Sequence, residues 1–311
     1  MAQPKMKFNC SKCGAETDAE VTTERYKKQL CRPCFGKRKD NRTNQLNDLT
    51  GTEWARHSKS IEAYPDIRTP NQKEHGACFP KALARHQIEI YTKAGEVVLD
   101  PFMGVGTTML AAHELGRRSL GIELNPRFAQ MCREEIAAHG IQAQLWEDDA
   151  DHMCAHIPNG TVDFILTSPP YANLLKTIKG DFAYKWREHS IIDPIKNPAP
   201  YSADEHDIGN MDYAQGIHAI ASIMTKCFAV QKLNSYAVWV VKDFRDLKRK
   251  LPYINFHGDV IRCAEAAGYA LWDIRIFDQT NFRPLVCLGY PSRNYYLNIG
   301  HSYILVFKKL R

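Results

Sequence analysis

The sequence predicts an α/β protein with a doubly wound, mostly parallel seven-stranded sheet, preceded by a small cysteine-rich unit. Two observations carry this prediction. From about residue 50 onward, strand-like and helix-like segments alternate, and four of the ten cysteines form two close pairs within the first 40 residues. Alternation of this kind is typical of a parallel sheet with helices on both faces. A chain of 311 residues is long enough for one large α/β domain and a small appendage.

Bulk composition is that of an ordinary globular protein, with 44% hydrophobic and 24% charged residues. The chain contains no apolar run of about 18 residues, and residues 1–5 lack the apolar core of a signal peptide. We therefore expect a cytoplasmic protein without a membrane partner. Residues 1–50 hold 11 Lys and Arg against 6 Asp and Glu, which is a mild bias toward phosphate.

The first 40 residues are predicted to form a zinc ribbon, followed by a polar linker over 41–50 and a main domain over 51–311. The zinc ligands of the ribbon would be the two C-x2-C pairs, Cys10 with Cys13 and Cys31 with Cys34. Zn²⁺ prefers four tetrahedral ligands, and a C-x2-C turn brings two sulfurs to one ion. The alternative is a reduced cysteine cluster or a redox pair. The six remaining cysteines are single and are expected to be small buried side chains.

In the main domain, apolar runs and turn residues predict seven strands and four long helices. The last two strands have no helix between them, so the final one could return antiparallel. The strands are expected at 97–100, 119–124, 143–147, 162–167, 236–243, 270–277 and 302–308, and the helices at 107–116, 126–138, 212–231 and 257–267.

A glycine-containing loop follows the first of these strands, with the sequence Asp-Pro-Phe-Met-Gly-Val-Gly-Thr-Thr over residues 100–108. Glycines let a backbone approach a ligand closely, and the free amides of a helix start favour a carboxylate. Glu123 lies 17 residues after Gly106, about where a ribose diol is usually bound. A dinucleotide site would want a third glycine, but Met109 stands there. Alternatively, Glu123 could cap the helix that starts at residue 126, and Asp149, which follows the strand expected at 143–147, could cap the next helix.

A second polar loop follows the strand at 162–167, with the sequence Thr-Ser-Pro-Pro-Tyr over residues 167–171. Two prolines end a strand ladder and fix the backbone carbonyls in place. An exocyclic amine on a base ring is a poor nucleophile, and two acceptors aimed at its hydrogens favour its nucleophilic form. The alternative is an ordinary exit from a strand into a loop.

Together, in this order, the two loops resemble those of the DNA amino-methyltransferases, which methylate the exocyclic nitrogen of cytosine or adenine using S-adenosylmethionine. The resemblance covers about residues 50–311 and implies the Rossmann-like methyltransferase variant of the doubly wound fold. It also implies a cofactor site in which Asp100 faces the ammonium, Glu123 the ribose and Asp149 the adenine, with Asp148 as a competitor for the last role. The full set implied is Phe79, Asp100, Pro101, Phe102, Gly104, Gly106, Thr107, Thr108, Glu123 and Asp149. The segment with Phe79 departs from the family pattern at Gly76, where a proline usually follows the histidine.

The same resemblance implies a catalytic loop of Ser168, Pro169, Pro170 and Tyr171. The Ser168 hydroxyl and the Pro169 carbonyl would accept the amine hydrogens, and Tyr171 would stack on a base that has left its helix. In the family, serine preceded by threonine goes mostly with cytosine N4, and aspartate mostly with adenine N6, so cytosine N4 is preferred. A C5-cytosine enzyme would need a Pro-Cys nucleophile, which this loop lacks.

Double-stranded DNA is the implied partner, and a cognate restriction endonuclease a second one if the chain acts in restriction-modification. Long segments at 172–211 and 278–300 carry basic and aromatic residues, and another basic stretch starts near 244. Sequence recognition is assigned to 278–300 and 244–255, with solvated surface loops as the alternative. An RNA or protein amine methyltransferase, and a non-catalytic zinc-ribbon DNA-binding protein with a relic fold, remain rival functions.

Overall fold

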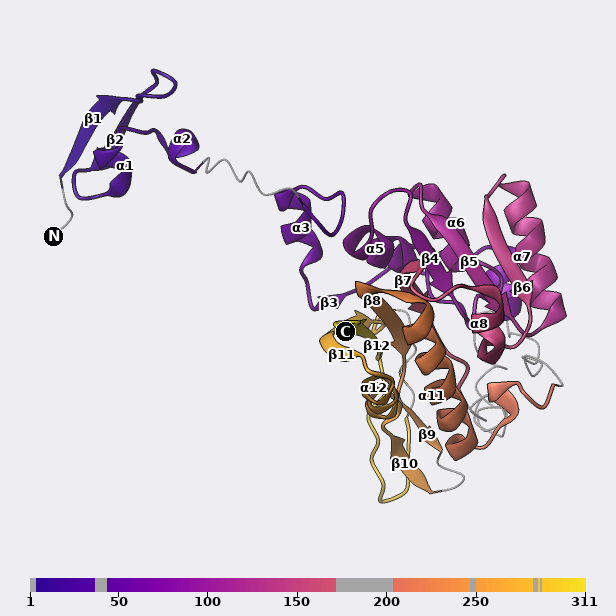
Figure 1. Ribbon diagram of the computed structural model, residues 1–311. Coiled ribbons are helices and arrows are strands. Elements are labelled where there is room, and N and C mark those ends of the chain that lie inside the picture. Colours follow the sequence, from indigo (N-terminus) through magenta and orange to yellow (C-terminus); the bar gives the residue numbers. More distant parts are fainter. Residues whose placement is uncertain (1–3, 37–43, 172–203, 247–249, 282–284, 286) are drawn as a thin grey trace. The chain divides into compact units, whose positions relative to one another are not determined.

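The computed structural model describes residues 4–36, 44–171, 204–246, 250–281, 285 and 287–311. The chain divides into two compact units, Met1–Gln45 and Leu46–Arg311, and each is considered by itself (Figure 1). Within the described ranges, no helix has the length and apolar character needed to cross a membrane.

Unit 1 is a small hairpin with two short helices. Strands β1 (Lys5–Asn9) and β2 (Glu16–Glu20) pair antiparallel, and α1 (Glu24–Lys27) and α2 (Arg32–Gly36) follow. Phe8 and Tyr26 meet edge to face with ring centroids 5.5 Å apart. Few apolar side chains are buried here, so a unit of this size needs a further source of stability.

Unit 2 contains an eight-stranded sheet in the order β3-β11-β12-β8-β7-β4-β5-β6. The predicted count of seven was wrong, because β3 pairs parallel with Ile276 and Phe277 of β11 at the sheet edge. A strand of only two residues carries no periodicity that a sequence pattern could reveal. The strands are β3 (Ile61–Glu62), β4 (Val97–Asp100), β5 (Arg118–Glu123), β6 (Ala143–Glu147), β7 (Val162–Thr167), β8 (Gln231–Val241), β11 (Ala270–Asp278) and β12 (His301–Lys308).

Strand directions follow the expected doubly wound pattern. Strands β6, β5, β4, β7 and β8 run parallel, whereas β12 lies antiparallel between β8 and β11. The predicted antiparallel return of the last strand is therefore confirmed, as is the mostly parallel sheet of the methyltransferase type. A separate hairpin, β9 (Phe244–Asp246) with β10 (Leu251–Ile254), leaves the carboxyl end of β8.

Helices cover both faces of the sheet (Figure 1). Because side chains alternate along a strand, Leu99 and Trp239 pack with helices α11 and α12 on one face, while Val98 and Val238 pack with α5 and α6 on the other. The helices are α3 (Gly51–His57), α4 (Pro70–His75), α5 (Lys81–Tyr91), α6 (Thr107–Glu114), α7 (Pro126–Ala138), α8 (Met153–His156), α11 (Tyr213–Val230) and α12 (Phe256–Ala267), with 3₁₀ turns η1 (Ala150–His152) and η2 (Ile208–Asn210).

Candidate active site

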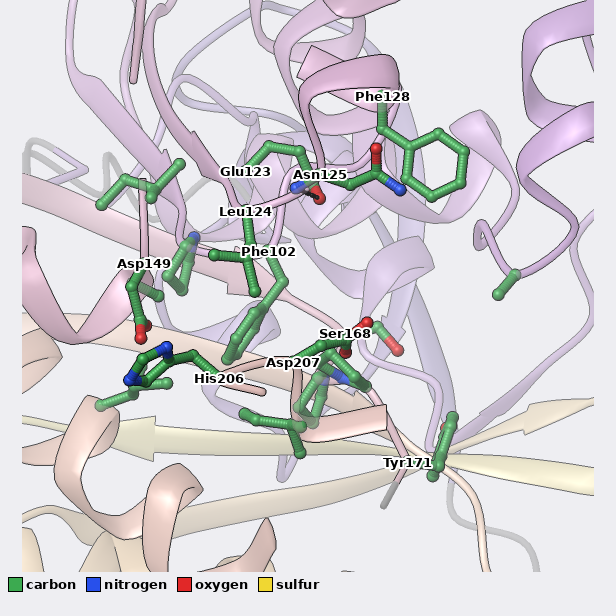
Figure 2. A pocket seen from close by; sticks show the side chains of 18 of the residues that line it. Phe102, Glu123, Leu124, Asn125, Phe128, Asp149, Ser168, Tyr171, His206 and Asp207 are labelled. Carbon is green, nitrogen blue, oxygen red and sulfur yellow. Dashed lines mark hydrogen bonds between the residues drawn. The ribbon is translucent and has the colours of Figure 1, made fainter. Parts of the chain in front are cut away.

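A cavity opens at the carboxyl ends of β4, β5, β6 and β7, where parallel strands bring their loops to one edge of the sheet (Figure 2). Both predicted loops reach it. Its lining includes Pro101 and Phe102 after β4, Glu123 to Asn125 at the end of β5, Asp149 and Ala150 after β6, Ser168 to Tyr171 after β7, and His206 to Ile208 at the start of η2. Residues 172–203, which include most of one predicted variable loop, lie outside the described residues.

Asp100 links the two loops from behind the cavity. Its carboxylate accepts hydrogen bonds from the Phe102 amide (3.0 Å), the Thr108 hydroxyl (2.6 Å) and the Thr167 hydroxyl (2.6 Å). The side chain is 3% exposed, and burial raises its pKa to about 6 despite these donors. Since Thr167 directly precedes Ser168, one buried carboxylate fixes the geometry of both loops.

Glycines 104 and 106 are required by neighbouring side chains and by backbone conformation. Both have positive φ, +52° and +85°. A Cβ on Gly104 would lie 2.8 Å from His75 Nε2, and one on Gly106 would lie 2.6 Å from Cys132 Sγ. These glycines therefore stand behind the cavity, against protein atoms. The same holds for the Thr107 hydroxyl, which accepts from the Gln72 amide at 2.7 Å.

Of the predicted cofactor residues, four line the cavity: Pro101, Phe102, Glu123 and Asp149. The other six, Phe79, Asp100, Gly104, Gly106, Thr107 and Thr108, are not part of its described lining. Phe79 packs instead against the buried cluster under α5.

Glu123 holds the backbone of both neighbouring loops. Its two oxygens accept from the Asn125 amide and the Gly104 amide, each at 2.9 Å. Burial raises the pKa of Glu123 to about 7, and the charges of Asp100 and Asp207 add to this rise. The cap of α7 is Asn125, whose side chain accepts from the Arg127 amide, so Glu123 is not needed as a helix cap.

The structure separates the two candidates for the adenine contact. Asp149 lines the cavity and also caps η1 by accepting from the Asp151 amide at 2.8 Å. Asp148 bonds instead to His152 Nδ1 (2.9 Å) and His156 Nε2 (2.6 Å), which lower its pKa to about 2. Of the two, Asp149 is the one placed to meet a ligand in this cavity.

Ser168, Pro169, Pro170 and Tyr171 all line the cavity. The Tyr171 ring packs against Phe256 (centroids 5.2 Å apart) and Phe244 (6.2 Å), which connects the loop over residues 167–171 to α12 and to the β9–β10 hairpin. This contact fixes the ring at the edge of the cavity.

Several lining residues were missed by sequence reasoning, namely His75, Ala77, Asn125, Phe128, His206 and Asp207. His75 packs on Phe128 with ring centroids 4.3 Å apart, and burial lowers its pKa to about 4, so the ring is neutral. The Asn-Pro pair at 125–126 was a recognisable helix start. His206 and Asp207 belong to no motif that the sequence shows.

Unit 1 gathers its four cysteines into one cluster. The sulfurs of Cys10, Cys13, Cys31 and Cys34 lie within 4.8 Å of one another, and Cys13 and Cys31 are 3.6 Å apart. Tetrahedral zinc with Zn–S bonds of about 2.3 Å places sulfurs about 3.8 Å apart. Backbone amides, first that of Cys31, lower the pKa of Cys10 to about 6 and so favour a thiolate. The donor set fits Zn²⁺.

Comparison with known proteins agrees with this architecture. The sequence model of a family described as DNA methylase matches residues 9–134, which include the first loop. Type II methyltransferase M.BglI of Bacillus subtilis is 37% identical over 91 residues, 29% of this chain and 26% of that protein. Type II methyltransferase M.SmaI of Serratia marcescens is 43% identical over 67 residues, 22% of this chain and 23% of that protein. The resemblance to DNA amino-methyltransferases is confirmed over this part of the chain.

These matches are local. The matched segments span about a quarter of the length of the two relatives. Among solved structures, TrmN from Thermus thermophilus has a TM-score of 0.47 and 17% identity, covering 78% of this chain and 54% of that one. The fold assignment accordingly rests on the strand order described above.

Proposed function

We propose that this protein is a DNA methyltransferase that transfers a methyl group from S-adenosylmethionine to the exocyclic amino group of a flipped base, preferably cytosine N4. The observation that supports it best is that Glu123 and Asp149 line the same cavity as Ser168 and Tyr171. The residues proposed to bind the nucleoside and those proposed to bind the target amine thus line one cavity. The partner is double-stranded DNA, and in a restriction-modification setting a cognate restriction endonuclease recognises the same site.

The chain's own residues bind and orient both reactants. Glu123 accepts from the ribose hydroxyls and Asp149 from the adenine amino group, while Phe102 covers the cofactor. The loop that surrounds the methionine end of the cofactor is held by Asp100, Gly104, Gly106, Thr107 and Thr108. Phe79 supports α5 beside this loop. S-adenosylmethionine, when bound, supplies an electrophilic methyl group. The chemistry needs no covalent intermediate with the protein.

At the base site, the Ser168 hydroxyl and the Pro169 carbonyl accept the two amine hydrogens. This raises electron density on the nitrogen and favours its tetrahedral form, which is the form that attacks. Pro170 fixes the loop, and Tyr171 stacks on the base. The preference for cytosine N4 over adenine N6 rests on Ser168 preceded by Thr167.

The first test is methylation by the purified full-length chain, with labelled S-adenosylmethionine and either duplex DNA or RNA. Label in DNA supports the proposal, whereas label only in RNA overturns it. Nucleoside analysis of the labelled DNA distinguishes N4-methylcytosine from N6-methyladenine. Failure to bind the cofactor at all would favour the non-catalytic DNA-binding protein instead.

We further propose that residues 244–255 and 278–300 recognise the DNA sequence; within these ranges, residues 247–249, 282–284 and 286 lie outside the described residues. Arg245 joins them: it donates to the Pro252 carbonyl and, at 3.1 Å, to the Leu297 carbonyl. Its guanidinium also lies 5.3 Å from the Tyr253 ring centre and 5.5 Å from that of Tyr296. Tyr253, Tyr290 and Tyr295 are exposed, and such rings suit contacts to sugars and unstacked bases.

In unit 1, we propose that the four cysteines bind one structural Zn²⁺ ion. The proposed domain division is a zinc ribbon over 1–40, a linker over 41–50 and the methyltransferase domain over 51–311, in which 172–211 and 278–300 are variable. The cysteine cluster supports the first assignment, because tetrathiolate sites without an open position are structural.

A further inference from the structure

Asp207 is a carboxylate in the cavity to which neither loop motif assigns a role. It lies at the start of η2, its side chain is 5% exposed, and it lines the same cavity as Glu123 and Ser168 (Figure 2). Its charge is one of those that raise the pKa of Glu123, so the two carboxylates share a poorly solvated environment.

The cavity is strongly acidic. Its described lining contains three carboxylates, those of Glu123, Asp149 and Asp207, and neither Lys nor Arg. Of the two histidines in that lining, His75 is kept neutral by burial, and His206 is mostly exposed and bonds to Asp204. Excess negative charge in a half-enclosed space favours a cationic ligand over a neutral one of the same shape.

We propose that Asp207 binds the sulfonium centre of the cofactor, so that the cavity prefers the methyl donor to its demethylated product. This inference rests on the proposed function. If Glu123 and Asp149 hold the nucleoside and Ser168 the target amine, the sulfur must lie between them, because methyl transfer is in line. Asp207 lines that cavity and carries the complementary charge.

The change in the cofactor's charge during the reaction gives Asp207 a role in the release of the product. When the amine nitrogen forms its bond to the methyl carbon, the S–C bond breaks and its electron pair stays on sulfur, so that the sulfonium becomes a neutral thioether. The positive charge passes to the amine nitrogen, which then loses one of its hydrogens as a proton to water. The attraction to Asp207 is then lost, and the product S-adenosylhomocysteine is held less tightly than the substrate. Asp207 therefore favours exchange of product for fresh cofactor.

Asp207 also has a structural role, which the test must keep intact. Its Oδ1 accepts from the Gly209 amide at 2.8 Å and so caps η2. Asparagine caps as well as aspartate, so Asp207→Asn removes the charge and keeps the cap. Asp204→Asn is the matched control: it removes a charge from the same segment, but Asp204 is 45% exposed and is not among the cavity's lining.

The experiment is calorimetric titration of the full-length protein with three ligands: S-adenosylmethionine, S-adenosylhomocysteine, and sinefungin, which carries an amine-bearing carbon in place of the methylated sulfur. We expect Asp207→Asn to weaken S-adenosylmethionine and sinefungin about ten-fold, and S-adenosylhomocysteine less than about two-fold. Asp204→Asn should leave all three unchanged. Asp207→Ser, another uncharged cap, repeats the test if the asparagine variant does not fold.

Equal weakening of the charged and neutral ligands would overturn the inference, because it would assign Asp207 to a part that all three share. Unchanged affinities would overturn it as well. Both results leave the proposed function standing, since the wild-type protein still binds the cofactor. A wild-type protein that binds none of the three contradicts the proposed function itself, and with it this inference.

Discussion

Single carboxylates organise the candidate site. Asp100 connects Thr108 of the first loop to Thr167 of the second, and Glu123 bonds to amides on both of its sides. Asp100 is buried and Glu123 is half-buried, each at the end of a parallel strand, where a polar group is retained only if it is hydrogen-bonded. Asp100 and Glu123 thus fix the backbone around the cavity, in addition to the roles proposed for them toward a ligand.

Ser168 is expected to act on the reaction and not on cofactor binding. Ser168→Ala removes one of two acceptors for the amine hydrogens, so we expect the single-turnover rate to fall about 100- to 1,000-fold. The dissociation constant of S-adenosylmethionine should stay within about two-fold, because the Glu123 and Asp149 contacts remain. Rapid-quench kinetics and calorimetry measure the two quantities. Equal losses in both would contradict the assigned role.

Cofactor affinity should depend on pH through Glu123. In the free protein, burial raises the pKa of Glu123 to about 7. A bound cation, and ribose hydroxyls that donate to the carboxylate, favour its ionised form and lower that pKa. Binding therefore releases a proton below pH 7, and affinity should rise from about pH 6 to pH 8 and then level off.

Calorimetric titration at several pH values measures this dependence, and Glu123→Gln provides the control. The glutamine keeps the side chain's size without the ionisation, but its amide nitrogen cannot accept, so one of the hydrogen bonds from the Gly104 and Asn125 amides is also lost. Its affinity should therefore be lower, and nearly independent of pH over the same range. A wild-type affinity that falls between pH 6 and pH 8 would contradict a role for ionised Glu123 in cofactor binding.

At the scale of elements, buried parallel strands were the most predictable part of the sequence. Segments such as Val97–Asp100 and Val162–Thr167 are short apolar runs that end in turn residues, and both form strands with the expected bounds. Strand β8 begins at Gln231, five residues before its predicted start, because its first residues continue directly from helix α11. Such a boundary depends on tertiary pairing and leaves no local signal.

For the glycine loop, the sequence predicted the motif but not the reason for its two glycines. The motif was recognised, but a close approach of ligand to glycine was the expected reason for Gly104 and Gly106. Their neighbours are His75 and Cys132, from helices α4 and α7, which a sequence pattern does not place. The positive φ values are likewise visible only in the folded chain.

Zinc should be needed for unit 1 alone. A hairpin with two short helices buries little apolar surface, so metal binding has to contribute on the order of 10 kcal/mol to its folding. We expect a chelator, or Cys34→Ser, to abolish amide-exchange protection in β1 and β2 while strands β4 and β7 keep theirs. Hydrogen exchange with mass spectrometry reads both units in one sample. Unchanged protection in β1 and β2 would contradict a structural metal.

The β9–β10 hairpin should affect DNA binding through its anchor, Asp243. This residue is fully buried and accepts from the Tyr253 hydroxyl (2.5 Å), the His257 amide (2.9 Å) and His257 Nδ1 (2.7 Å). Tyr253→Phe removes one of these bonds, which loosens strand β10 relative to Phe244 of β9 and to Tyr171. We expect DNA affinity to fall several-fold, and cofactor affinity to stay unchanged.

Tyr269→Phe is the matched control for that variant. It removes a buried hydroxyl that donates to Gln231 at 2.5 Å, at the opposite end of β8. Fluorescence anisotropy with a duplex, at one fixed salt concentration, compares the two variants. If both lose DNA affinity equally, the effect is one of general stability and the hairpin has no special part in recognition.

In the whole molecule, the sequence predicted the sheet and its two loops, because strand order in a doubly wound fold forces them to one edge. The sequence did not predict which residues form the third side of the cavity. That side comes from residues 206–208, which follow a segment, residues 172–203, whose sequence carries no motif. The proposed function could therefore be inferred from two strand ends, whereas the electrostatics of the site required the folded chain.

Charge is divided unequally between the two units, and this leads to a final prediction. Residues 1–45 hold 11 Lys and Arg against 5 Asp and Glu, whereas residues 46–311 hold 30 of each. The chain's net charge of +6 is thus confined to unit 1, where Zn²⁺ bound by four thiolates would reduce it by two. Since nonspecific DNA binding depends on neutralising phosphates, we expect unit 1 to supply much of it.

Deleting residues 1–45 should therefore weaken binding to a nonspecific duplex and flatten its dependence on salt, measured by anisotropy between about 50 and 200 mM salt. Affinity for S-adenosylmethionine should not change, because every described residue that lines the cavity belongs to unit 2. A variant in which unit 1 lysines are replaced by glutamine separates charge from fold and should reproduce the flatter dependence. A truncated protein with unchanged DNA affinity and salt dependence would show that unit 1 contacts something other than phosphate.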